Sequence, residues 1–165
     1  MDEVNKKLVI GWFSFTCSED STILLTEMLN DHFSEWKKLV EFRFFKALKT
    51  HNRIVDLDIA FVEGAISSEV QAASLKNIRA NAKYLVAIGA CACTGQPSSG
   101  RNTLVAKDIN YKISYYLKNF DYSQNVQKIA DFVPVDDQVN GCPMDPKKFI
   151  EILNKYLELF NIVKY

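Results

Sequence analysis

Residues 8–17 read Leu8-Val9-Ile10-Gly11-Trp12-Phe13-Ser14-Phe15-Thr16-Cys17, an apolar run of strand length that stops at a cysteine. Similar short runs recur at residues 40–48, 59–62, 84–88 and 130–135. Unbroken apolar strands are typical of a parallel sheet, because both faces of such a sheet are covered and no residue of the strand faces water. The runs therefore predict five strands.

Segments with the apolar spacing of amphipathic helices separate these runs. Helical spacing follows Cys17 from Ile23 onward, and further helices are expected at residues 69–82 and from about Thr103 to Leu117. A last helix opens at Asp145-Pro146, where proline suits the first turn. The alternation predicts an α/β, flavodoxin-like, doubly wound fold: a mostly parallel five-stranded sheet with helices on both faces. We expect residues 1–165 to form a single domain, because this length suits one core.

Charge and hydropathy exclude several classes of protein. Twenty basic and 20 acidic side chains cancel, which gives no electrostatic reason to expect nucleic acid or an anionic membrane surface as a partner. No apolar run approaches the roughly 20 residues of a membrane span, and the acidic opening at residues 1–7 does not resemble a signal peptide. We therefore expect a cytoplasmic protein, in which four cysteines are a metal or redox set rather than a disulfide framework.

All four cysteines follow predicted strands. Cys17 follows the first strand, Cys91 and Cys93 follow the fourth, and Cys142 follows the fifth. Ligands of open parallel sheets bind at the carboxyl ends of the strands, so we expect these cysteines at one ligand-binding edge. Any one of them could still be a buried core thiol, and Cys93 is the strongest candidate for that alternative.

The spacing of the cysteines favours an iron–sulfur cluster over zinc. Structural zinc sites usually contain two close pairs such as C-x-x-C, and the chain has no such pair. A cubane cluster accepts ligands from distant loops. Asp20, three residues after Cys17, could supply a carboxylate ligand at the entry of a helix, where the helix dipole favours an anion. Aspartate in such a position is also a common helix cap.

The chain resembles the small subunit of nickel–iron hydrogenases, a family related to the cluster-bearing 20-kDa-type subunit of complex I. In that family C-x-x-C follows the first strand, G-x-C-A-x-x-G the fourth and G-C-P the fifth. The counterparts here are Cys17 with Asp20, residues 89–95, and Gly141-Cys142-Pro143. The likeness covers nearly the whole chain, and the three motifs occur in the family's order.

Two further segments carry the resemblance. Val62-Glu63-Gly64 resembles the family's V-E-G segment, whose acid lies near the cluster and the large-subunit interface. Arg101-Asn102 resembles the version found in soluble NAD-linked hydrogenases. The resemblance implies that this chain supplies no catalytic residue for bond making or breaking.

The ligand set follows from the resemblance. It implies one proximal [4Fe-4S] cluster held by Cys17, Cys91 and Cys142, with Asp20 in place of the missing second cysteine, because an aspartate can occupy that place in deazaflavin-reducing hydrogenases. Glu19 is the next candidate for the fourth ligand, followed by water or no ligand. Cys93 falls at a non-ligand position, and we expect it and Glu63 beside the cluster without binding it.

The resemblance implies an electron-transfer subunit of a cytoplasmic hydrogenase that is NAD-linked, bifurcating or of the deazaflavin type. Its partners would be a large subunit with the nickel–iron centre and further iron–sulfur or flavin subunits. One alternative is the cluster-bearing subunit of a complex I-like or membrane-bound oxidoreductase without hydrogen chemistry. That branch usually has adjacent cysteines in the first motif, whereas this chain has Cys17-Ser18. The other alternative is a flavin-binding, flavodoxin-like module without a cluster.

Overall fold

The computed structural model describes residues 6–104 and 110–163. Its centre is a parallel five-stranded sheet in the order β2-β1-β3-β4-β5. This is the flavodoxin-like strand order, in which the direction of winding reverses beside β1. The predicted doubly wound α/β fold is confirmed. The strands are β1 (Leu8–Ser14), β2 (Val40–Phe45), β3 (Leu57–Glu63), β4 (Ala82–Ile88) and β5 (Asp137–Val139).

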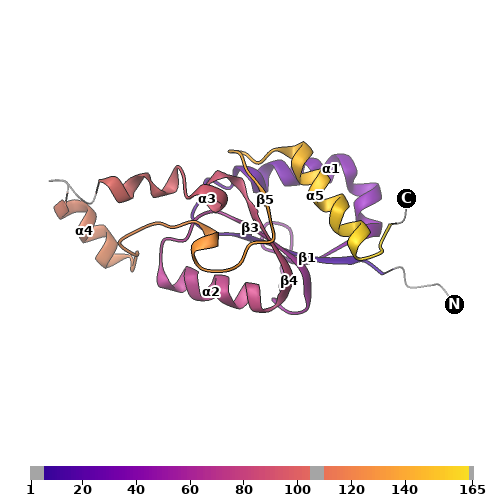
Figure 1. Ribbon diagram of the computed structural model, residues 1–165, viewed down its shortest axis with the longest axis horizontal. Coiled ribbons are helices and arrows are strands. Elements are labelled where there is room, and N and C mark those ends of the chain that lie inside the picture. The colour runs from indigo at the N-terminus through magenta and orange to yellow at the C-terminus, as the bar shows by residue number, and fades with distance from the viewer. Residues whose placement is uncertain (1–5, 105–109, 164–165) are drawn as a thin grey trace.

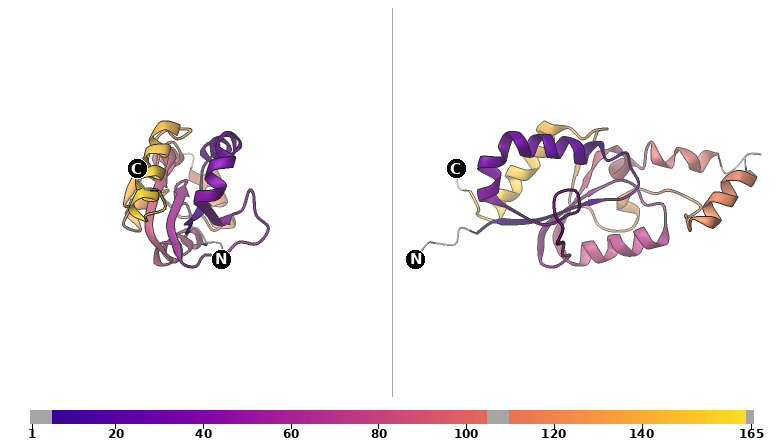
Figure 2. Two further views of the ribbon diagram at one scale, coloured as in Figure 1. Left: turned by 90° about the vertical axis from the view of Figure 1, so that its right-hand side faces the viewer. Right: turned by 180° about the vertical axis from the view of Figure 1, so that it is seen from behind.

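Helices cover both faces of the sheet. Figure 1 shows α1 (Asp20–Leu39) and α5 (Pro146–Leu159) on one face and α2 (Glu69–Ala80) on the other, and the views of Figure 2 agree. The remaining helices are α3 (Gly89–Thr94), which follows β4 without a loop, the 3-10 helices η1 (Ser98–Thr103) and η2 (Ile129–Asp131), and α4 (Asn110–Asn119). In Figure 1, α4 lies away from the sheet. Among the described residues, no helix combines the length and apolar character that a membrane crossing requires.

Two apolar layers hold the sheet between the helices. On the α1 and α5 side, the Trp12 ring lies 5.8 Å from Phe61 and 6.0 Å from Phe149, measured between ring centroids. On the α2 side, Leu75 packs with Val62 and other buried residues. Side chains alternate along a strand, so neighbouring residues of β3 enter opposite layers. All seven residues of β3 are buried, which makes it the central strand on which the site is built.

The fifth strand differs from the prediction. The apolar run at 130–135 predicts a strand, but residues 129–131 form η2, and pairing with β4 begins only at Asp137. Ile129 and Val133 are buried in the layer beside α2. The run is therefore apolar because a compact turn packs into the core, and hydropathy alone does not separate that case from strand pairing.

Two other boundaries also move. The second apolar run was expected at residues 40–48, but β2 ends at Phe45. The helix expected from Thr103 to Leu117 appears as α4, which begins at Asn110, while residues 105–109 lie outside the described residues. Residues 98–103, just before this gap, form the 3-10 helix η1.

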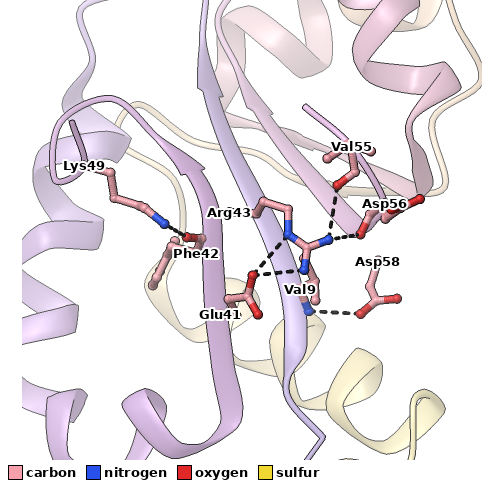
Figure 3. A network of polar contacts seen from close by, with 8 residues as sticks. All are labelled: Val9, Glu41, Phe42, Arg43, Lys49, Val55, Asp56 and Asp58. Carbon is pink, nitrogen blue, oxygen red and sulfur yellow. Dashed lines mark hydrogen bonds and ion pairs between the residues drawn. The ribbon is translucent and has the colours of Figure 1, made fainter. Parts of the chain in front are cut away.

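A polar network fastens the connection between β2 and β3 to the sheet (Figure 3). The Arg43 guanidinium donates hydrogen bonds to the backbone oxygens of Val55 and Asp56, at 3.2 and 2.9 Å. The Asp58 carboxylate accepts the Val9 backbone N–H at 2.9 Å. These contacts tie β1, β2 and β3 together at the edge opposite the cysteines, which fixes the register of the strands that carry the site.

Candidate functional site

Three cysteines and one aspartate line a single cavity at the carboxyl edge of the sheet. Cys17 comes from the loop after β1, Asp20 from the start of α1, Cys91 from α3 after β4, and Cys142 from the turn after β5. These are the residues that the sequence predicts as neighbours. The cavity also includes Glu63, the last residue of β3.

The sulfur atoms have close polar neighbours. The Cys142 thiol donates to Asp20 Oδ2 at 3.6 Å. Cys91 Sγ lies 3.2 Å from the Ser98 hydroxyl oxygen, and Cys17 Sγ lies 3.8 Å from that of Ser14. Hydroxyl groups at these distances can donate hydrogen bonds to thiolates, which stabilises the charged form.

Burial varies across the site. Cys91 is buried and packs in a small apolar cluster with Ala65 and Val126, against which Cys17 lies partly buried. Cys142 is exposed. The cavity therefore has an apolar inner wall and a rim that is exposed at the surface of the chain at Cys142.

Backbone hydrogen bonds hold together the segments that line the cavity. The Ala90 N–H of α3 donates to the Gly141 carbonyl at 2.7 Å. The Met144 N–H, in the same turn as Gly141, donates to the Ser21 hydroxyl of α1 at 3.2 Å. The turn that carries Cys142 is thus tied to both helices that line the cavity.

The loop with Cys17 is fixed by pairing with the end of β3. The Phe15 N–H donates to the Glu63 carbonyl at 2.8 Å, and Thr16 and Ala65 exchange two backbone hydrogen bonds of 3.0 and 2.9 Å. Gly64 lies between these residues with φ +92°, in the region that favours glycine. The chain can therefore reverse beside Phe15 and Thr16 and deliver Cys17 to the cavity.

Glu63 is a buried carboxylate between the cavity and α1. It accepts the Ser21 backbone N–H at 3.0 Å and the Thr22 hydroxyl at 2.7 Å. The N-cap residue of α1 is Glu19, whose side chain makes no capping hydrogen bond. Asp20 is the first residue of the helix and stands in its first turn. The carboxylate that caps this helix therefore comes from β3.

The local environment favours the protonated form of two cysteines of the cavity, Cys17 and Cys142. Burial raises the pKa of Cys17 to about 11, and the negative charge of Glu63 adds to the shift. Desolvation also raises the pKa of Cys142, and the hydrogen bond and charge of Asp20 act in the same direction. Metal binding requires thiolates and therefore displaces these protons. A cluster of thiols and carboxylates of this kind suits a positively charged metal group.

Cys93 and Glu19 lie elsewhere. Cys93 belongs to the apolar layer on the α2 side, where its thiol donates to the Ala87 carbonyl at 3.6 Å and burial raises its pKa to about 11. Residues 89–94 are helical, and side chains two positions apart on a helix point in nearly opposite directions. Glu19 lines a separate, wider cavity of about 600 Å³ beside Phe13 and Phe44. Neither residue lines the cysteine cavity.

Three serines of this site were not predicted from the sequence. Ser14 and Ser98 lie beside sulfur atoms, and Ser21 joins α1 to the Cys142 turn. Serine is common in loops and at helix starts, so the sequence contains no signal that separates these residues from other serines. Only their positions next to the predicted strand ends could have suggested a role.

The geometry distinguishes two kinds of metal site. Within residues 6–104 and 110–163, no three His, Cys, Asp or Glu side chains are grouped as a single metal ion requires. A cluster does not need its ligands to converge on one point, because each ligand binds a different iron atom. The cavity between the four potential ligands has a volume of only about 10 Å³. The donor set, three thiols and one carboxylate from separate segments, and not the size of the space, therefore suits a cluster better than a mononuclear ion.

Comparison with protein families and known proteins agrees with this picture. The family described as NADH ubiquinone oxidoreductase, 20 Kd subunit, matches residues 17–156. Sulfhydrogenase 2 subunit delta of Pyrococcus furiosus is 26% identical over 148 residues, which are 87% of this chain and 60% of that protein. The NAD-reducing hydrogenase HoxS subunit delta of Cupriavidus necator is 42% identical over 113 residues, which are 58% of this chain and 53% of that protein. The chain thus spans between about half and three fifths of these curated relatives.

A solved structure shares the fold. A chain in the crystal structure of an NAD+-reducing [NiFe]-hydrogenase in the H2-reduced state matches with a TM-score of 0.77 and 20% identity. The match covers 97% of this chain and 99% of that chain. At this level of identity the likeness concerns the architecture, and it agrees with the parallel sheet and helical layers described above.

Proposed function

The chain belongs to the family of the 20-kDa subunit of NADH ubiquinone oxidoreductase, and from this premise we propose that it is an electron-transfer subunit of a multisubunit nickel–iron hydrogenase. It would carry one proximal [4Fe-4S] cluster between the nickel–iron large subunit and further iron–sulfur or flavin subunits. Two relatives that are named as hydrogenase subunits support this branch of the family. The single observation that carries the proposal is the meeting of Cys17, Cys91, Cys142 and Asp20 around one cavity.

The residues of the cavity suit such a cluster. Cys17, Cys91 and Cys142 would bind three iron atoms, and Asp20 would bind the fourth. When bound, the cluster would supply one-electron transfer. The protein would hold the four ligands and place the Ser14 hydroxyl beside a sulfur atom. The apolar inner wall of the cavity would shield the cluster from water on that side. Hydrogen bonds to sulfur, net charge and solvent exposure are the factors by which a protein sets the potential of a cluster.

The exposed rim supports a role within a complex. Cys142 is exposed, so a cluster bound here would be open to solvent unless another subunit covered it. We propose that the large subunit covers this rim, which would bring the cluster close to the nickel–iron centre. The balanced charge gives no reason to expect nucleic acid as a partner. Four free cysteines suit the reducing cytoplasm, which we propose as the location.

Iron and sulfide analysis tests the proposal. The chain, produced and purified under anaerobic conditions with its partner subunits, should contribute about four iron and four sulfide per chain. Cys17→Ser and Cys142→Ser should each lower this content and alter the absorbance near about 400 nm, which is typical of iron–sulfur proteins. Cys93→Ser is the matched control, because Cys93 lies outside the cavity. An iron-free, folded protein, or iron content that is the same in all three variants, would overturn the proposal. A yellow preparation with bound flavin would favour the flavin-binding alternative.

The fourth ligand has its own test. Replacing Asp20 with cysteine changes the charge and softness of one ligand, so the midpoint potential of the cluster and its electron paramagnetic resonance (EPR) spectrum should both change. Asp20→Glu is the conservative control, because it retains a carboxylate. If the redox titration and the spectrum of Asp20→Cys match those of the wild type, Asp20 is not a ligand.

A second candidate function is the cluster-bearing subunit of a complex I-like or membrane-bound oxidoreductase without hydrogen chemistry. The description of the matching family favours it, since that family is described by a subunit of NADH ubiquinone oxidoreductase. The large subunit that co-purifies with the chain separates the two candidates. Two C-x-x-C pairs for nickel and iron in that subunit, together with hydrogen-dependent reduction of the cluster, indicate a hydrogenase. Their absence indicates the second candidate.

A further inference from the structure

The carboxylate of Glu63 joins the central strand to the first turn of α1. Its side chain is buried, with only 3% of the residue exposed. Oε1 accepts the Ser21 backbone N–H at 3.0 Å, and Oε2 accepts the Thr22 hydroxyl at 2.7 Å. The indole N–H of Trp12 donates to the Thr22 oxygen at 2.8 Å. That bond directs the Thr22 hydroxyl hydrogen toward Glu63, so the carboxylate is held in one orientation.

This contact replaces a local helix cap. The first N–H groups of a helix have no partner within the helix, and the N-cap residue Glu19 makes no side-chain capping hydrogen bond. Glu19 has φ +62°, a left-handed conformation that is uncommon for a residue with a side chain. The chain therefore enters α1 through a sharp turn, and the Glu63 carboxylate satisfies the Ser21 N–H. A negative charge at this end of a helix is also favoured by the helix dipole.

Asp20 lies between these two features. It follows the left-handed residue Glu19 and directly precedes Ser21, the residue whose backbone Glu63 holds. The Asp20 carboxylate lies 3.6 Å from the sulfur of Cys142, across the cavity rim. The position of its backbone is therefore set on one side by the turn and on the other by the Glu63 hydrogen bond.

We propose that Glu63 is a positioning residue, which holds the first turn of α1 so that Asp20 can bind the cluster as its carboxylate ligand. This inference rests on the proposed function, because it requires the cluster. It assigns to Glu63 a role through Asp20 and not through direct contact with iron. The two carboxylates of the cavity thus have different tasks, one as a ligand and one as the anchor of the helix that carries the ligand.

A double-mutant comparison in the complete complex tests this role. The variants are Glu63→Ala, Glu63→Gln, Asp20→Ala and the combination of Asp20→Ala with Glu63→Ala. The measurements are the iron content per chain, the EPR spectrum of the reduced cluster and its midpoint potential. Glu63→Ala should shift the spectrum and the potential to those of Asp20→Ala. Glu63→Gln should give a spectrum between those of the wild type and Glu63→Ala, because its amide oxygen can still accept the Ser21 N–H while its NH2 group no longer accepts the Thr22 hydroxyl. In the Asp20→Ala background, Glu63→Ala should leave the EPR spectrum unchanged, since two residues that act through one contact are not additive. The midpoint potential should move only by the effect of the lost Glu63 charge, which also acts on Cys17.

The outcomes separate the inference from the proposed function. A wild-type complex without iron in this chain refutes the proposed function. Iron in the wild type, with an unchanged spectrum and potential in Glu63→Ala, refutes the positioning role while leaving the cluster in place. An equal change of the EPR spectrum with and without Asp20 also refutes it, because Glu63 would then act on the cluster independently.

A pair of variants at Thr22 carries the test if Glu63→Ala does not fold. Thr22→Val removes the hydroxyl that donates to Glu63, and Thr22→Ser retains it. Thr22→Val should move the EPR spectrum toward that of Asp20→Ala, and Thr22→Ser should not. A wild-type spectrum in Thr22→Val would overturn the inference.

Discussion

Gly64 is a residue of the site at which the surrounding backbone leaves too little room for a Cβ atom. An ideal Cβ at this position would lie 2.9 Å from the Phe15 carbonyl carbon and 2.9 Å from the Thr16 nitrogen. Both neighbours are backbone atoms, and Phe15 and Thr16 are hydrogen bonded to the end of β3. Neither side can move without breaking bonds that hold the loop with Cys17. We therefore expect Gly64→Ala to disturb stability and site together.

The expected magnitude has two parts. Holding alanine at φ +92° costs on the order of 1–3 kcal/mol of backbone strain. Relieving the contact with the Phe15 and Thr16 backbone weakens at least one hydrogen bond, which adds about 1 kcal/mol. The sum is about 3 kcal/mol, which for a domain of this size corresponds to a fall in Tm of roughly 6–12 °C.

Gly100→Ala is the matched control. Gly100 has no heavy atom within 4 Å of an added Cβ and does not have a positive φ. Its replacement should change the free energy of unfolding by no more than about 0.5–1 kcal/mol, with stabilisation as the expected direction. Thermal unfolding followed by circular dichroism compares the two variants, and iron analysis shows whether Cys17 is still in place. If Gly64→Ala unfolds at the same temperature as Gly100→Ala and holds the same iron, the reasoning about this turn is wrong.

Two further predictions concern the layers that support the site. Tyr156→Phe removes the hydroxyl that donates to Asp137 Oδ2 at 2.6 Å and should destabilise the protein by about 1–2 kcal/mol at neutral pH. Burial raises the pKa of Asp137, but hydrogen bonds from Lys155 and Tyr156 outweigh it, so the net pKa is below the usual value. This stabilisation is present above the unfolded pKa of about 4 and is lost as pH falls through the lower folded value. Urea unfolding should therefore show that the difference in unfolding free energy between the wild type and Tyr156→Phe shrinks in acid. A difference that is constant with pH would contradict this prediction. Leu75→Ala, at a fully buried position of α2, should lower the free energy of unfolding by about 2–5 kcal/mol. Val70 is 76% exposed on the same helix, so Val70→Ala should lower it by less than about 0.5 kcal/mol. Equal losses of stability in the two variants would show that α2 does not pack as described.

The arrangement of the cysteines could be predicted because it depends on topology alone. Once residues 8–15 and 84–88 are read as parallel strands, Cys17 and Cys91 must follow the same edge of the sheet. The described structure confirms that they share a cavity with Cys142 and Asp20. That these residues bind a cluster stays a prediction, since ligation depends on a group that is not part of the chain.

The position of Cys93 could not be predicted in the same way. If residues 89–95 continued as an extended segment, Cys91 and Cys93, two positions apart, would point the same way. Residues 89–94 instead form α3 directly after the strand, so Cys91 faces the cavity and Cys93 faces the core. Six small residues are too few to show a helical period. The direction of these two side chains therefore could not be obtained from the pattern.

The residue that caps α1 also could not be predicted from the local sequence pattern. Helix starts are predicted from a capping side chain that is adjacent in sequence, and here the candidates are Asp20, Ser21 and Thr22. In the structure the helix already begins at Asp20, and the carboxylate that caps it comes from Glu63, 42 positions from Ser21 in the sequence. No local rule finds such a partner. The contact also makes the first turn of α1 dependent on the central strand. Residue identity and strand order therefore predict which groups meet at the edge of the sheet, whereas their orientation depends on long-range contacts that arise on folding.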